Sequence, residues 1–103
     1  MHPLIEQNRE TIATLCRQYG VRQLAVFGSI LRGDFDPERS DVDLVAEFGP
    51  PESGDLVGQY FDLKERLEQV LRRKVDLVEL SAVRNNRMRQ HIEATRVPVY
   101  VTH

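Results

Sequence analysis

Three aspartates stand among apolar residues, where acidic side chains are uncommon. Asp41 and Asp43 lie in the segment Ser-Asp-Val-Asp-Leu-Val at residues 40–45, and Asp76 interrupts the apolar run at residues 75–78. Residues two apart in an extended strand point the same way, so Asp41 and Asp43 set two negative charges side by side. Such a pair is unfavourable unless a cation lies between the carboxylates.

Asp76 strengthens the case for a cation. A carboxylate buried inside a strand without a partner would cost on the order of several kcal/mol. Because the nearby donors are oxygens, without cysteine or histidine, Asp41, Asp43 and Asp76 are predicted to hold magnesium, or manganese, rather than zinc. The alternative is that the first two are solvated acids where a loop meets a strand, and that Asp76 lies on an exposed strand face.

A glycine-serine turn precedes the acidic pair. Gly28 allows a phosphate to approach the backbone, and N–H groups at a helix start, together with the Ser29 hydroxyl, can donate to its oxygens. Arg32, one turn further on, could neutralise phosphate charge or could pair with Asp34 or Asp36. The same residues also suit an ordinary glycine turn followed by a helix-capping serine.

The surrounding pattern alternates helices and strands. Helical spacing of apolar residues, with Pro3 in the first turn and Gly20 as a stop, predicts a helix over residues 4–19, a second over 55–73, and a third from a Ser81 cap to about Ala94. Strands are predicted at Val21–Phe27, Val42–Phe48, residues 74–80 and Val97–Val101, the last at an edge because of Pro98. We therefore expect one α/β domain over residues 1–103, with a mixed sheet of about four strands and helices packed mainly on one side.

Composition limits the possible classes of protein. The chain has 103 residues, 41% hydrophobic and 29% charged, with a net charge of −2. No overall basic field would draw it to nucleic acid, and no run is long and apolar enough to span a membrane. Cys16 is the only cysteine, so no intramolecular disulfide is possible, and its spacing is typical of a small core residue. We expect a cytoplasmic protein without a signal peptide.

These motifs together resemble a known superfamily. Phe27-Gly28-Ser29-x-x-Arg32-Gly33, then Ser40-Asp41-x-Asp43-Leu44 and the later Asp76, are similar to the signature of the DNA polymerase β-like nucleotidyltransferases. The finer pattern resembles the minimal nucleotidyltransferases known as MNT antitoxins, whose operon partners are HEPN ribonuclease toxins in type VII toxin–antitoxin systems. The resemblance covers nearly the whole chain, although the loop between Ser29 and Asp41 varies in length within the family.

The resemblance implies a magnesium-dependent transfer of AMP from ATP to a tyrosine hydroxyl of the HEPN toxin, which neutralises the toxin. Asp41 and Asp43 would bind both metal ions, and Asp76 would bind the catalytic one and help to deprotonate the hydroxyl. Gly28 and Ser29 would hold the triphosphate, and we expect Arg32 and Ser40 to contact the nucleotide as well. The predicted helices and strands are all used by this core and leave none for a second domain, so we expect the acceptor to arrive on another chain.

Three alternatives remain open from sequence. The protein could be a catalytically silent antitoxin that neutralises the toxin by binding it. It could modify a small molecule, although the antibiotic-modifying enzymes that resemble this core carry an additional domain. Basic residues could bind nucleic acid, but without interleaved aromatic residues they offer no stacking platform, and a solvated face or a contact with an acidic toxin surface explains them as well. This basic set comprises Arg72, Arg73, Lys74, Arg84, Arg87, Arg89 and Arg96.

Overall fold

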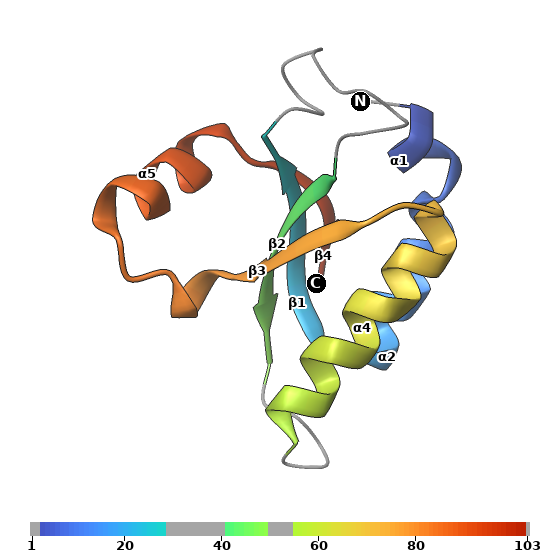
Figure 1. The fold of residues 1–103 in the computed structure, drawn as a ribbon. Helices are drawn as coiled ribbons and strands as arrows, with labels where there is room; N and C mark the ends of the chain where they lie inside the picture. Colours follow the sequence, from blue (N-terminus) through green and yellow to red (C-terminus); the bar gives the residue numbers. More distant parts are fainter. Residues whose placement is uncertain (1–2, 29–40, 50–54, 103) are drawn as a thin grey trace.

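A four-stranded mixed sheet forms the centre of the computed structural model, which describes residues 3–28, 41–49 and 55–102 (Figure 1). The strands stand in the order β3-β2-β1-β4. Strand β1 (Val21–Phe27) is antiparallel to β2 (Val42–Phe48) and to β4 (Val97–Val101), and β2 is parallel to β3 (Val75–Glu79). The predicted mixed sheet is confirmed, the bounds of β1, β2 and β4 agree with the prediction, and Pro98 lies on an edge strand as expected.

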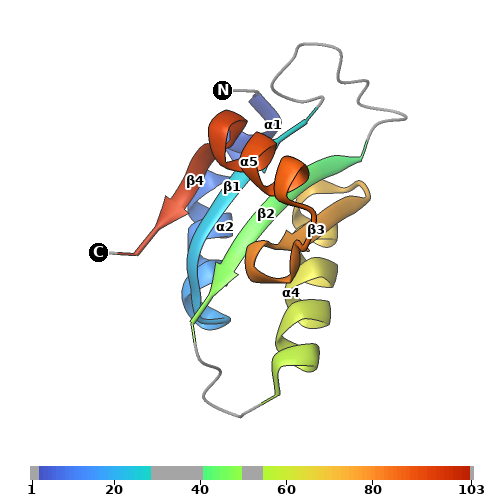
Figure 2. The same cartoon turned by 90° about the vertical axis from the view of Figure 1, so that its left-hand side faces the viewer.

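Helices cover the two faces of the sheet unequally. Helices α1 (Pro3–Gln7), α2 (Arg9–Gln18) and α4 (Leu56–Leu71) pack on one face, and α5 (Asn86–Thr95) lies over the other (Figures 1 and 2). The prediction that most helices share one side is therefore confirmed. We call the first side the helix face and the second the open face.

The core divides in the same way. On the helix face, alternate residues of the strands pack with one stripe of each helix, and Leu24, Leu44, Leu63 and Leu67 are fully buried there. A smaller cluster on the open face joins β1 and β2 to the C-terminal elements; its buried members are Ala25, Val45, Leu80 and Ile92. The open face is thus covered by far less apolar material than the helix face.

Helix α4 has clear start and stop signals. The Asp55 side chain accepts a hydrogen bond from the Gly58 N–H at 2.9 Å, which satisfies a free donor of the first turn. The helix ends where Arg72 adopts the left-handed conformation, with φ of 56°. The predicted span of 55–73 begins at the N-cap and ends one residue beyond the C-cap.

The first predicted helix is in fact two. The chain breaks at Asn8, whose side-chain amide donates to the Leu4 carbonyl at 2.8 Å and whose backbone N–H donates to the Ile5 carbonyl at 3.1 Å. Asparagine competes with the helical ladder in this way, so the apolar spacing continues although the helix does not. The predicted stop is confirmed, since Gly20 has φ of +70° directly after α2 and Tyr19.

The prediction that Ser81 caps the last helix is wrong. Ser81 lies in a short 3-10 turn, η1 (Leu80–Ala82), and its hydroxyl donates to the Glu79 carboxylate. Helix α5 begins later, where the Asn85 side chain accepts from the Met88 N–H at 3.1 Å. Serine and asparagine are both good capping residues, and in this chain Asn85 caps the helix, while Ser81 stays in the 3-10 turn with the buried Leu80.

Candidate active site

The strand register brings two of the predicted carboxylates together. Asp43 on β2 is directly opposite Asp76 on the neighbouring parallel strand β3. Adjacent strands lie about 4.8 Å apart, which lets two carboxylates share one small ion. Asp41 stands just before β2, where the Val42 N–H donates to the Lys74 carbonyl at 3.0 Å and continues the ladder to this end of the sheet.

All three acids belong to the open face. Val42, Leu44, Val75 and Leu77 are buried in the helix-face core, so the residues between them point the other way. Asp41 and Asp76 are exposed, and Asp43 is partly exposed. The expectation that Asp76 is buried is wrong: the apolar neighbours in its strand face the core, whereas Asp76 faces solvent. Asp76 therefore does not need a metal ion to offset a cost of burial. The support for a metal site is instead the strand register, which sets Asp76 opposite Asp43.

Gly28 lies directly against the Asp43 carboxylate. It follows β1, where Phe27 pairs with Asp43, and it has φ of +77°. A Cβ atom at this position would lie 2.2 Å from Asp43 Oδ2, closer than atoms can approach. The predicted glycine turn is therefore confirmed. Glycine is needed at position 28 for two reasons: the backbone conformation disfavours other residues, and the Asp43 carboxylate occupies the space that a Cβ atom would fill.

The remaining predicted nucleotide contacts, Ser29, Arg32 and Ser40, lie outside the described residues. The candidate site is accordingly defined by Gly28, Asp41, Asp43 and Asp76, which stand at one end of the sheet.

The donor set fits a hard divalent cation, because all three side chains offer carboxylate oxygens. In the described part of the chain, however, no group of three or more His, Cys, Asp or Glu side chains is drawn together closely enough to hold a metal ion. The backbone thus makes the acids neighbours, while their carboxylates do not converge. Like charges favour such separation until a cation joins them.

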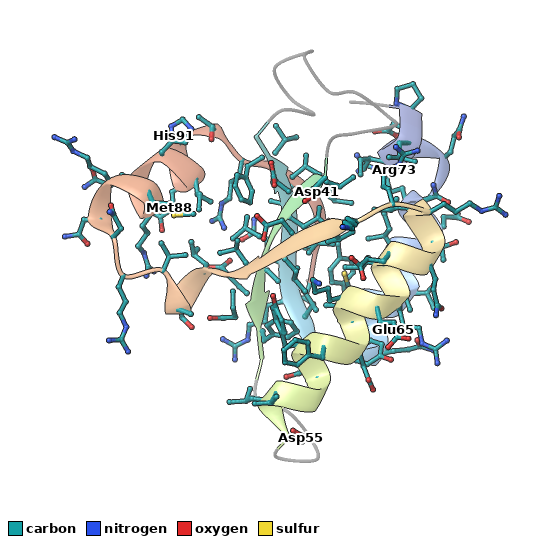
Figure 3. All side chains as sticks on the ribbon, viewed as in Figure 1. Asp41, Asp55, Glu65, Arg73, Met88 and His91 are labelled. Atoms are coloured by element: carbon teal, nitrogen blue, oxygen red, sulfur yellow. The ribbon has the colours of Figure 1, made fainter. Side chains whose placement is uncertain are left out.

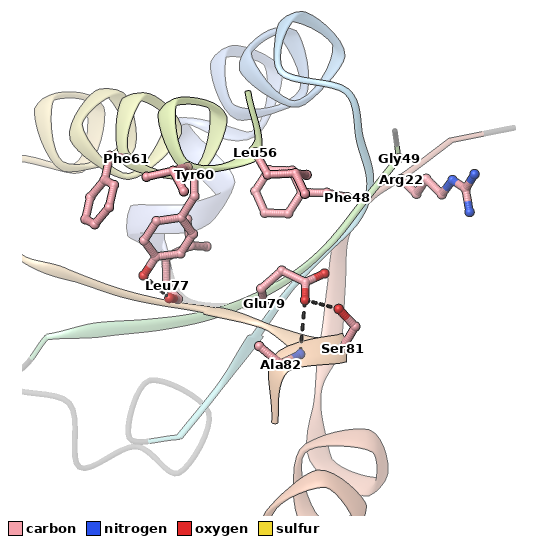
Figure 4. A pocket seen from close by; sticks show the side chains of 11 residues that line it. Arg22, Phe48, Gly49, Leu56, Tyr60, Phe61, Leu77, Glu79, Ser81 and Ala82 are labelled. Carbon is pink, nitrogen blue, oxygen red and sulfur yellow. Dashed lines mark hydrogen bonds between the residues drawn. The ribbon is translucent and has the colours of Figure 1, made fainter. Parts of the chain in front are cut away.

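An apolar cavity of about 770 Å³ opens at the other end of the sheet (Figure 4). It lies between the start of α4, with Leu56, Tyr60 and Phe61, and the ends of β2 and β3, with Phe48 and Glu79. Phe48 lies five positions further along β2 than Asp43, about 17 Å in an extended strand. This cavity is thus distinct from the carboxylate site, and its apolar lining does not suit a triphosphate.

Several of the basic residues are engaged with the protein itself. Arg89 lies 3.6 Å from Glu93 and donates to the Leu80 carbonyl at 3.4 Å, and Arg96 lies 3.6 Å from Glu47.

No helix in the described part of the chain is long and apolar enough to cross a membrane.

The chain belongs to the nucleotidyltransferase domain family, whose model matches residues 9–98. It is 38% identical over 71 residues to the protein adenylyltransferase MntA of Thermococcus cleftensis, covering 69% of this chain and 68% of that protein. It also superimposes on a structure described as a candidate minimal nucleotidyltransferase, with a TM-score of 0.75, 32% identity and 90% coverage of each chain. A tri-AMPylated HEPN toxin of Shewanella oneidensis in complex with MNT antitoxin gives a TM-score of 0.66 at 21% identity, covering 95% of this chain and 73% of that one, and this likeness concerns the fold.

Proposed function

We propose that this protein is the antitoxin of a type VII HEPN/MNT system and transfers AMP from ATP to a tyrosine hydroxyl of its cognate HEPN toxin, with magnesium as the metal. The observation that carries the proposal is the pairing of Asp43 with Asp76 beside the glycine turn at Gly28. Two comparisons support the proposal. The related MntA of Thermococcus cleftensis is a protein adenylyltransferase by name, and this chain shares its fold with an MNT antitoxin in complex with an AMPylated HEPN toxin.

In the proposed reaction, the tyrosine oxygen attacks the α-phosphorus of ATP, and the bond to the bridging oxygen of the β-phosphate breaks. AMP becomes attached to the toxin, and pyrophosphate leaves. Asp41 and Asp43 would hold two magnesium ions, and Asp76 would hold one of them and accept the tyrosine proton. Bound magnesium supplies charge neutralisation for the phosphates and lowers the pKa of the hydroxyl. The Gly28 turn leaves room for the Asp43 carboxylate at the site.

The test is to incubate the protein with labelled ATP, magnesium and the HEPN protein of the adjacent gene. We expect the mass of the HEPN protein to rise by whole AMP units and peptide sequencing to locate them on tyrosine. Asp43→Asn should lower the rate by about a hundredfold or more, because a carboxylate that places charge and metal is lost. Labelling of RNA or of a small metabolite, with the HEPN protein unmodified, would overturn the proposal.

Neutralisation in cells separates chemistry from binding alone. We expect the double variant Asp41→Asn, Asp43→Asn to bind the toxin and yet fail to protect the cell from it. Full protection by this variant would show that the protein acts by occupying the toxin, without a need for transfer.

A further inference from the structure

Among the strands of the described residues, β3 stands at an edge of the sheet, and its backbone pairs there with β2 alone. Edge strands are more easily displaced than central ones, because one row of N–H and C=O groups has no strand partner. Asp76 stands at the centre of this short strand, which runs over Val75–Glu79. A residue that must hold a metal ion within a few tenths of an ångström is thus placed on the least supported strand next to the site.

Two side chains of α4 bind the outer edge of β3 on either side of Asp76. The Glu68 carboxylate accepts a hydrogen bond from the Val75 N–H, with Oε2 at 3.1 Å. The Tyr60 hydroxyl donates to the Leu77 carbonyl at 2.5 Å (Figure 4). We call these two contacts the α4 clamp.

The α4 clamp fixes the backbone at both ends of the tripeptide 75–77. Its inner edge is held by the ladder to β2, in which Asp76 pairs with Asp43. With the peptide groups on both sides held, the backbone torsions of Asp76 are confined, and with them the direction in which its side chain leaves the strand. Helix α4 is itself held by the buried side chains of Leu63, Leu67 and Leu71, so the clamp is anchored in the main core.

We infer that Tyr60 and Glu68 are positioning residues, which hold the backbone of Asp76 in register with Asp43 so that both carboxylates can reach one metal ion. This inference rests on the proposed function, because it needs Asp76 to act in the site. Neither residue is expected to touch ATP or the acceptor, since both act on the far edge of the strand that carries Asp76.

The test compares Tyr60→Phe and Glu68→Gln, which keep the size of each side chain and remove the hydroxyl or the charge. We expect each variant to lower kcat/KM for AMP transfer by about tenfold and the double variant by more, as when the supporting contacts of a metal ligand are lost. The apparent magnesium constant should rise, and a higher magnesium concentration should restore part of the rate. A purely structural role would lower the folded fraction and leave the magnesium dependence unchanged.

Two further measurements do not depend on activity. Mn²⁺ binding to the protein without nucleotide, followed by electron paramagnetic resonance, should weaken by about tenfold in each clamp variant. Hydrogen exchange at the amides of residues 75–77 should become faster, while the amides of the central strand β1 keep their protection.

Matched controls come from the same chain. Glu65→Gln removes an exposed carboxylate one turn earlier on α4 (Figure 3), and Tyr100→Phe removes the hydroxyl of a partly buried tyrosine on β4, the opposite edge of the sheet. Both controls should keep the wild-type magnesium constant and the wild-type Mn²⁺ affinity.

Asp76→Asn distinguishes the two ways of failing. If it loses transfer while both clamp variants keep wild-type magnesium constants and Mn²⁺ affinity, the positioning role is wrong and the proposed function stands. If Asp76→Asn retains full transfer, the proposed role of Asp76 is wrong, and the clamp has nothing to position.

Discussion

Gly28 shows how much of the site depends on single atoms. Its missing Cβ leaves space for Asp43 Oδ2, which would otherwise be 2.2 Å away, and its φ of +77° is costly for other residues. Loss of this glycine should therefore affect both the fold and the direction of the Asp43 carboxylate.

We predict that Gly28→Ala lowers the free energy of unfolding by about 1–3 kcal/mol, because alanine is strained in this conformation. The rate of AMP transfer should fall by about a hundredfold as Asp43 is displaced. Urea denaturation and the transfer assay measure the two effects.

Gly20→Ala is the matched control for this change. Gly20 has nearly the same conformation, with φ of +70°, but among the described residues its new Cβ would meet the Gln59 side-chain nitrogen, at 3.1 Å, and no carboxylate. A similar loss of stability with an unchanged transfer rate is expected. Equal losses of rate in both glycine variants would show that the Gly28 effect is one of stability alone.

The Cys16 thiol gives a prediction about pH. Burial raises the pKa of Cys16 from 9.0 to about 12, although the positive charge of Arg17 acts in the opposite direction. The native protein therefore keeps this proton at pH values where the unfolded chain loses it, so the stabilising contribution is complete below about pH 9 and is lost as the pH rises toward 12. Between about pH 8 and about pH 11, the free energy of unfolding should therefore fall less in Cys16→Ala than in the wild-type protein. Equal pH dependence in both proteins would contradict the prediction.

At the scale of the elements, apolar periodicity predicts what the core needs and misses what polar side chains decide. The bounds of β1 and β2 follow from short runs of buried apolar residues, residues 24–26 in β1 and 44–46 in β2, so a sequence pattern suffices for them. The break at Asn8 and the start of α5 at Asn85 depend on particular side-chain hydrogen bonds, which the spacing of apolar residues does not reveal.

The cap of α5 can be tested with a pair of variants. Asn85→Ala should lower the free energy of unfolding by about 1 kcal/mol, because the Met88 N–H loses its acceptor. Ser81→Ala should have a smaller effect, about 0.5 kcal/mol or less, since the exposed Ser81 hydroxyl donates to the Glu79 carboxylate and caps no helix. Urea denaturation measures both, and a larger effect at Ser81 would show that the helix starts earlier than the structure places it.

At the scale of the whole molecule, the site is assembled from segments far apart in the chain. The motif at residues 27–44 could be recognised from sequence, and the apolar run around Asp76 marked a strand. The sequence does not show that β3 pairs in parallel with β2. This pairing, and the register that sets Asp76 beside Asp43, are seen only in the folded structure. The α4 clamp could not be predicted either, because Tyr60 meets Leu77 across 17 positions and its own spacing is that of a core residue.

Metal binding should therefore couple to the stability of the whole fold. Asp43 and Asp76 are neighbours whose charges repel, so magnesium should raise the melting temperature of the wild-type protein. At a hundred times the dissociation constant, the stabilisation would be about 2.7 kcal/mol. The double variant Asp43→Asn, Asp76→Asn should melt at the same temperature with and without magnesium. A magnesium-induced rise that persists in this variant would locate the ion elsewhere.

The most direct measurement is a crystal structure of the protein with Mn²⁺ and a non-hydrolysable ATP analogue, in which anomalous scattering locates the ion. We predict a peak about 2.0–2.3 Å from carboxylate oxygens of both Asp43 and Asp76, with the triphosphate beside Gly28. A peak that Asp76 does not contact, or a triphosphate bound away from this end of the sheet, would contradict the account.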